Sequence, residues 1–288
     1  MTKALQELVD ILRPTLIGPD KYRGIGSRND GAPGTYGGHF LGQATAAASA
    51  TVGDDRALHS LHAYFLRGGS PGEAIDYKVE RVRDGRSFSV RRVMASQDGE
   101  NKFELLASFA VPSEGAEIAA VLPSDFEDLP EPESLSRYKE LMMSHDPIPL
   151  PKDWALRDYG LDVRVVNAPW SRNGISPAGG IRMWIRADGT APAEPKLHSA
   201  MLAYQSDESL ADNMLVPFGL TWSSPNVFFV SLDHAMWIHR PIDLNTWHFV
   251  EQWPITAVAS RGIGTGQVWT QDRKLVASFT QEVLMSID

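Results

Sequence analysis

The chain has 288 residues, a formal net charge of −9 at pH 7 and no cysteine. Its composition, 43% hydrophobic and 22% charged, is typical of a globular protein with one large domain or two of ordinary size. The lack of cysteine excludes disulfides, a thiolate nucleophile and thiolate metal sites. The negative charge argues against general nucleic-acid binding, which needs clustered Lys and Arg. We expect a cytoplasmic protein with no nucleic-acid partner.

The first residues predict a short amphipathic helix over 1–13, because Leu5, Leu8, Val9 and Leu12 recur at helical spacing. No stretch of the sequence approaches the roughly 18 consecutive apolar residues of a membrane-spanning helix. We therefore expect no membrane span.

The first half continues with a loop and then one helix followed by strands. Residues 22–35 are rich in Gly, Asn, Asp and Pro and indicate a loop. Residues 44–52 are Ala-rich and free of Pro, which favours a helix of small residues that can lie close to a sheet. Alternation and Gly-containing turns then predict four antiparallel strands, at 61–66, 77–82, 87–95 and 105–111.

The middle of the chain departs from this pattern. Pro, Glu, Asp and Ser dominate 123–133, which indicates an exposed connection. Residues 134–145 favour a helix, and Pro147, Pro149 and Pro151 interrupt regular structure after it. We divide the chain into an N-terminal module at 1–115, a linker at 116–160 and a C-terminal module at 161–288.

The second half repeats the order of the first. A strand is predicted at 181–185 and a helix at 197–207, where Leu197, Met201 and Tyr204 form an apolar stripe. Further strands are predicted at 227–231, 232–241, 247–253, 262–270 and 275–284.

Short matches between the halves indicate an internal repeat. His-Ala opens an apolar run in both 61–67 and 232–241, where His62 and His234 are 172 positions apart. Residues 106–109, Leu-Ala-Ser-Phe, match Val-Ala-Ser-Phe at 276–279. Two copies of a helix followed by antiparallel strands predict an α+β fold in which each sheet wraps its own helix.

Three polar residues distinguish the second copy. Asp207, Ser231 and Gln281 align with about Ala48, His59 and Val111 of the first copy. Alone, Asp207 favours a surface residue at a helix end over a buried acid-base group, since Asp is seldom buried without a partner. The coincidence of all three favours a functional site.

An arginine-rich hairpin offers a second candidate site. Arg81, Arg83, Arg86, Arg91 and Arg92 lie in and around it. A solvated strand face and a phosphate-binding surface both fit this pattern, because charge runs are usually exposed and the guanidinium group suits phosphate. The histidines include no convincing set of three or four convergent metal ligands, so we expect no metal.

The sequence resembles the acyl-CoA thioesterase II family, the TesB-like thioesterases. The resemblance covers residues from about 20 to the end, with little signal in the linker. The stretches that carry it are Gly-Gly-His-Phe-Leu-Gly-Gln-Ala at 37–44, Asp-Arg at 55–56 with Leu-His-Ser-Leu-His at 58–62, Tyr-Phe-Leu-Arg at 64–67, Arg-Asp-Gly-Arg-Ser-Phe-Ser-Val-Arg-Arg-Val at 83–93, Trp-Ile-Arg at 184–186, Ser-Leu-Asp-His-Ala-Met-Trp-Ile-His-Arg-Pro at 231–241 and Leu-Val-Ala-Ser-Phe-Thr-Gln-Glu at 275–282.

This resemblance implies a double hotdog fold and hydrolysis of acyl-CoA to free fatty acid and CoA, with no cofactor. It implies that Asp207, Ser231 and Gln281 hold and activate a water, with Ser231 where the bacterial pattern has Thr. Ser keeps the hydroxyl but lacks the methyl group that restricts its rotation. Arg83, Arg86 and Arg91 are the candidate ligands of the CoA phosphates. The resemblance also suggests a homodimer or a higher homo-oligomer.

Two other functions remain open from the sequence. Gly-Asp-Asp-Arg-Ala-Leu-His at 53–59 resembles a motif of hotdog-fold enoyl-CoA hydratases and dehydratases, although the Asn and Pro of that motif are Arg56 and Ala57 here. A non-catalytic acyl-CoA-binding protein would have the same fold with no turnover. The three polar residues of the second copy argue against it.

Overall fold

A computed structural model describes residues 1–27, 34–118, 120–144, 152–169, 171 and 173–287. The end of the helix predicted at 134–145 and the three prolines that follow it lie outside the described residues. The helices are α1 (Lys3–Ile11), α2 (Gly37–Ser49), α3 (Tyr138–Met143), α4 (Lys152–Ala155) and α5 (Pro195–Ser206), with short 3₁₀ turns η1 (Phe126–Asp128), η2 (Pro132–Ser134), η3 (Ala211–Met214) and η4 (Val216–Phe218).

The described strands form one 13-stranded antiparallel sheet in the order β1-β2-β4-β5-β6-β3-β10-β13-β12-β11-β8-β7, with β9 paired to β13. The strands are β1 (Thr15–Gly18), β2 (Lys21–Gly24), β3 (Ala57–Phe65), β4 (Ile75–Asp84), β5 (Phe88–Gln97), β6 (Glu100–Ala110), β7 (Leu161–Asn167), β8 (Ile181–Ala187), β9 (Val227–Ser231), β10 (Asp233–Ile238), β11 (His248–Val258), β12 (Arg261–Thr270) and β13 (Leu275–Ile287).

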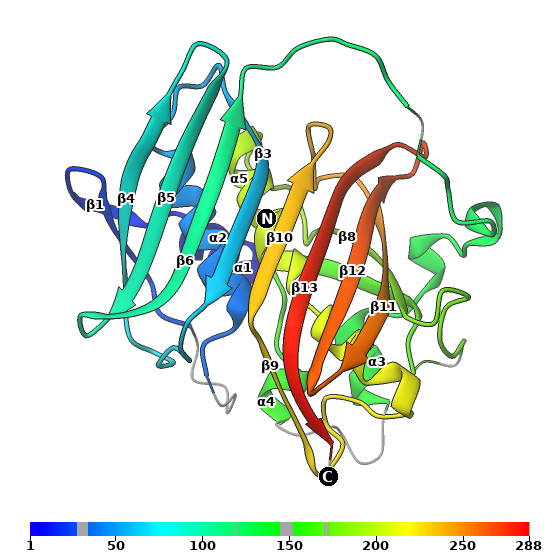
Figure 1. The fold of residues 1–288 in the computed structure, drawn as a ribbon. Coiled ribbons are helices and arrows are strands. Elements are labelled where there is room, and N and C mark those ends of the chain that lie inside the picture. The colour runs from blue at the N-terminus through cyan, green and yellow to red at the C-terminus, as the bar shows by residue number, and fades with distance from the viewer. Residues whose placement is uncertain (28–33, 119, 145–151, 170, 172, 288) are drawn as a thin grey trace.

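The two halves share this sheet. β3 of the first half pairs antiparallel with β10 of the second, with Leu61 opposite Met236 and Ala63 opposite His234 (Figure 1). The sheets of the two predicted modules are therefore joined edge to edge. An edge strand exposes unpaired backbone groups, and pairing the edges of the two halves satisfies them.

Helices α2 and α5 lie against each other on one side of the sheet, behind it in Figure 1. Gly42 permits this approach, because a Cβ there would lie 3.1 Å from Tyr204 Cβ and 3.2 Å from the Ala200 carbonyl oxygen. α2 begins at Gly37, seven residues before the predicted start at Ala44. Its glycines disfavour a helix in isolation, and burial of nearly the whole segment outweighs that preference.

The predicted exposed connection at 123–133 is exposed only in part. Phe126 is buried and packs against Phe249 and Trp184, with ring centroids 5.4 and 6.4 Å away. The Trp184 Nε1–H donates to the Pro130 carbonyl at 3.1 Å. Trp184 lies on β8 and Phe249 on β11, so the linker packs against one face of these two strands.

The matching His-Ala pairs do not occupy equivalent positions. His62 on β3 is exposed, whereas His234 on β10 is 1% exposed. Side chains alternate between the faces of a strand, so a shift of one residue reverses the face. The repeat predicts the two-module architecture correctly, but the 172-residue offset does not hold at this position.

The N-terminal helix predicted at 1–13 is present as α1, whereas the short strands β1 and β2 were not predicted. Within the described residues, no helix combines the length and apolar character needed to cross a membrane.

Candidate active site

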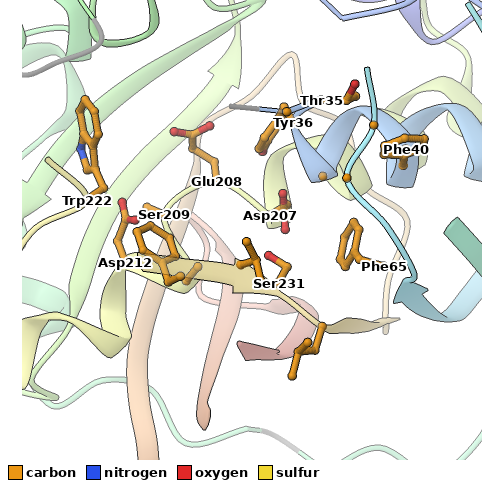
Figure 2. A pocket seen from close by; sticks show the side chains of 18 of the residues that line it. Thr35, Tyr36, Phe40, Phe65, Asp207, Glu208, Ser209, Asp212, Trp222 and Ser231 are labelled. Atoms are coloured by element: carbon orange, nitrogen blue, oxygen red, sulfur yellow. The ribbon is translucent and has the colours of Figure 1, made fainter. Parts of the chain in front are cut away.

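A cavity of about 780 Å³ opens between the two halves. Its lining comes from the start of α2, the loop after β3, strands β7 and β8, residues 207–209, 211 and 212, and strand β9. Figure 2 shows Asp207 and Ser231 near each other in this cavity, with Phe65 and Tyr36 from the first half beside them. Both halves therefore contribute to one site.

The three predicted polar residues meet at this cavity. Asp207 lies directly after α5, Ser231 ends β9 and Gln281 lies within β13. The Gln281 Nε2 donates to Asp207 Oδ1 at 2.9 Å and also to Ser231 Oγ. The backbone N–H of Gly38, at the start of α2, donates to Asp207 Oδ2 at 2.8 Å. The carboxylate is thus held by one group from each half of the chain.

Burial raises the pKa of Asp207 to about 7. The hydrogen bond from Gln281 lowers this pKa, the nearby Glu208 carboxylate raises it, and the Gly38 N–H lowers it again. An unpaired carboxylate away from water loses solvation in its charged form, which explains why burial dominates. Asp207 can therefore gain and lose a proton near neutral pH, as a general base must.

The carboxylate of Glu208, the residue after Asp207, was not predicted as part of the site. Arg157 Nη2 lies 2.7 Å from Glu208 Oε2, and the Tyr159 hydroxyl donates to Glu208 Oε1 at 3.0 Å. The Arg157 guanidinium also stacks 4.3 Å from the centre of the Tyr159 ring. Arg157 and Tyr159 lie in the predicted linker, where no periodicity or motif singles them out.

Asp212 is a further acidic residue of the cavity lining that the sequence did not single out. Burial and then the Glu208 carboxylate raise its pKa to about 7. Figure 2 shows Asp212 beside Trp222, on the part of the wall away from Phe65. It has the same raised pKa as Asp207 without the contacts to Ser231 and Gln281.

The predicted CoA-binding arginines lie outside the cavity lining, around the turn between β4 and β5. Arg83 and Arg86 are exposed, and their proposed phosphate contacts stay a prediction. Arg91 is 1% exposed and donates to Thr51 Oγ1 at 2.8 Å and to Asp84 Oδ1 at 2.7 Å. Because its guanidinium is buried and bonded within the N-terminal half, its position does not favour phosphate binding.

Two central helices covered by one shared sheet define a double hotdog protein. A hot dog fold protein from Alicyclobacillus acidocaldarius has the same architecture, with a TM-score of 0.76 at 18% identity over the whole of both chains. The crystal structure of an acyl-CoA thioesterase II, TesB2, from Mycobacterium marinum gives a TM-score of 0.79 at 31% identity over 98% of each chain.

The sequence comparisons identify the family. The profile described as acyl-CoA thioesterase matches residues 158–284, and that of the acyl-CoA thioesterase N-terminal domain matches residues 26–110. Acyl-CoA thioesterase 2 of Haemophilus influenzae is 32% identical over 99% of both chains. This chain belongs to the acyl-CoA thioesterase II family, the TesB-like thioesterases.

Proposed function

We propose that this protein hydrolyses fatty acyl-CoA to free fatty acid and CoA, using a water activated by Asp207. The observation that carries the proposal is that Asp207 and Ser231 line a cavity between the modules and that Gln281 bonds both of them. The names of the relatives supply the substrate class, and the raised pKa of Asp207 supplies the base.

In this mechanism the ionised Asp207 takes a proton from a water that the Ser231 hydroxyl orients, while Gln281 holds the Asp207 carboxylate and Ser231 in place. The water oxygen bonds to the thioester carbonyl carbon, and the C=O electron pair moves to the carbonyl oxygen. That pair then re-forms the C=O bond as the C–S bond breaks. The proton on Asp207 passes to the departing thiolate, which restores the carboxylate. A positioned base of this kind contributes roughly 10²–10⁴-fold to the rate.

The apolar part of the cavity suits the acyl chain. Val163 and Val165 of β7 and Ile181 and Met183 of β8 line one wall. The volume of about 780 Å³ lies within the range of roughly 300–1,000 Å³ for small-molecule sites. Apolar walls favour a hydrocarbon over a polar acyl group because chain burial removes apolar surface from water.

The rival functions have less support. The His59 Nε2 of the hydratase-like segment bonds Ser108 Oγ at 2.8 Å, and His59 is not among the lining residues of the cavity. A protein that only binds acyl-CoA would have no use for a buried carboxylate, which is costly to keep.

Thiol release should distinguish these functions. We expect saturated acyl-CoA thioesters, from butanoyl to palmitoyl, to yield equal amounts of CoA thiol and free fatty acid. KM should fall as the chain lengthens, because each buried CH₂ group contributes about 0.8 kcal/mol. Conversion of an enoyl-CoA to a 3-hydroxyacyl-CoA without thiol release would establish the hydratase function instead. Binding without turnover would establish the non-catalytic one.

We also propose that the protein acts as a homodimer or higher homo-oligomer in the cytoplasm. Support comes from apolar residues on neighbouring strands β6, β3 and β10, where Leu106, Tyr64 and Trp237 are 47%, 63% and 38% exposed. Exposed apolar surface of this kind favours association. We expect light scattering to give at least twice the monomer mass of 31.7 kDa. A monomer mass at micromolar concentration would contradict the assembly.

A further inference from the structure

The Gln281 carboxamide must point its Nε2 toward Asp207 and Ser231 to make the contacts described above. Those contacts hold the Nε2 atom but not the Oε1 atom. Its Nε2 donates to Asp207 and Ser231, which uses both hydrogens. Its Oε1 is buried and meets no donor in hydrogen-bonding geometry among the described residues. A rotation of the amide by 180° would place Oε1 against the Asp207 carboxylate. A donor beside Oε1 would prevent that rotation.

His234 lies where such a donor is needed. The ladder between β10 and β13 pairs Ala235 with Thr280, so the preceding residue, His234, is level with Gln281. Directly opposite residues on one face have Cβ atoms about 4.5–5.5 Å apart. Both side chains are buried, with 1% of each exposed. The imidazole stacks on Phe279, with ring centroids 6.2 Å apart and an interplanar angle of 15°.

The two ring nitrogens of His234 have different surroundings. Nε2 lies 2.9 Å from Ser206 Oγ, whereas Nδ1 is buried and, like Gln281 Oε1, meets no partner in hydrogen-bonding geometry. Burial lowers the pKa of His234 to about 4, and the Gln281 side chain counteracts this only in part. The ring is therefore neutral at neutral pH, with one N–H donor and one acceptor.

Only one tautomer satisfies the buried atoms. If Nε2 carried the proton, Nδ1 and Gln281 Oε1 would face each other as two acceptors. If Nδ1 carries the proton, it can donate to Oε1, and the Ser206 hydroxyl can donate to Nε2. That hydroxyl lies 3.0 Å from the Ala203 carbonyl and 2.9 Å from Nε2, so either oxygen or nitrogen can receive its proton. Leaving a buried polar atom unsatisfied costs about 1–3 kcal/mol, which favours the Nδ1–H form.

We propose that His234 is a positioning residue whose Nδ1–H holds the Gln281 carboxamide with Nε2 toward Asp207 and Ser231. Ser206, on the other side of the ring, permits this tautomer because its hydroxyl can donate to Nε2. The inference rests on the proposed function, because it assigns His234 a role through Gln281. It also gives a reason why His234 points inward while His62, in the matching motif, is exposed.

Nuclear magnetic resonance of the wild-type protein with ¹⁵N-labelled histidine tests the tautomer directly. The His234 resonances, identified by their loss in His234→Asn, should show the proton on Nδ1. A proton on Nε2 would overturn the proposal. This readout needs neither substrate nor turnover.

Two variants test the effect on catalysis. The side-chain amide of Asn can replace the Nδ1 donor, and the longer Gln amide can replace only the Nε2 contact to Ser206. We expect His234→Asn to keep kcat within about threefold of wild type. We expect His234→Gln to lower kcat about 10-fold with KM unchanged. Equal losses in both, or no loss in either, would contradict the role of Nδ1.

A failure of the proposed role of His234 can be distinguished from a failure of the proposed function. If Asp207→Asn retains full thiol release, the proposed mechanism fails whatever the His234 variants do. If Asp207→Asn is inactive while the two His234 variants behave alike, only the role of His234 fails. If the His234→Gln protein does not fold, the tautomer measured in the wild type decides.

Discussion

Asp207→Asn should lower kcat for acyl-CoA hydrolysis by at least ~100-fold, because it removes the only proposed base while keeping the size of the side chain. The variant retains an amide oxygen that can accept from Gly38 or Gln281, so the local packing should survive. Steady-state thiol release at saturating substrate measures the effect. Turnover within a few-fold of wild type would exclude Asp207 as the base.

Asp212→Asn is the matched control for this variant. Asp212 belongs to the same cavity lining and also has a pKa raised to about 7, but it has no contact with Ser231 or Gln281. We expect its kcat to stay within a few-fold of wild type. A loss of kcat as large as that of Asp207→Asn would indicate that any acidic residue of the cavity matters, and not specifically the group of Asp207, Ser231 and Gln281.

Thermal unfolding should show that Asp207→Asn remains folded and should reveal the cost of the native carboxylate. The folded-state pKa of about 7 lies above the ordinary Asp value of 3.8, so the wild type loses stability as pH rises between these values. Asn does not ionise, so the variant loses no stability from this cause as pH rises. The Tm difference between variant and wild type should therefore shift in favour of the variant from pH 5 to pH 8. A shift in the opposite direction would contradict the raised pKa.

Arg182→Met should destabilise the protein by about 3–5 kcal/mol, since it leaves a buried carboxylate without a partner. Arg182 on β8 is 3% exposed, and its Nη2 lies 2.6 Å from Glu251, which is 6% exposed. Its other contacts reach the linker, where Nη1 and Nη2 donate to the two oxygens of Asp125 at 2.7 and 3.0 Å. The arginine thus joins the sheet to the segment that covers its aromatic face. Urea unfolding measures the loss.

Two further variants show whether the lost stability of Arg182→Met comes from the unpaired Glu251 carboxylate. Arg92→Met removes an exposed arginine that bonds Glu104 at 2.8 Å, and it should cost at most about 1 kcal/mol. Adding Glu251→Leu to Arg182→Met should recover part of the stability, because it removes the carboxylate that the first substitution leaves without its arginine. A double variant as unstable as the sum of its single variants would show that the two side chains act independently.

The order of elements could be predicted from the sequence because local patterns encode it. Alternation and turn residues predict the strands β3 to β6, and small residues predict the position of α2, whereas β1, β2 and β7 were missed. The pairing of β3 with β10 could not be predicted, because the register between strands about 170 residues apart depends on tertiary contacts. The start of α2 at Gly37 was missed for a similar reason, since helix propensity disfavours glycine and packing overrides it.

The candidate site was likewise predicted only in part. Asp207, Ser231 and Gln281 were identified because they interrupt the repeat and match a family pattern, and they meet in the structure. Arg157 and Glu208 were missed because a half-buried ion pair between the linker and the residues after α5 leaves no periodic signal. Arg91 was chosen by residue type alone, and its burial became visible only when the strand's face was known.

The pH dependence of kcat, measured for wild type and Asp207→Asn from pH 5 to pH 9, tests the central claim most directly. The base must be ionised, so wild-type kcat should rise with pH through an apparent pKa of about 7 and then reach a plateau. The residual rate of Asp207→Asn should lack this rise, and Asp212→Asn should keep it. The same pH dependence in wild type and Asp207→Asn would contradict activation of the water by Asp207.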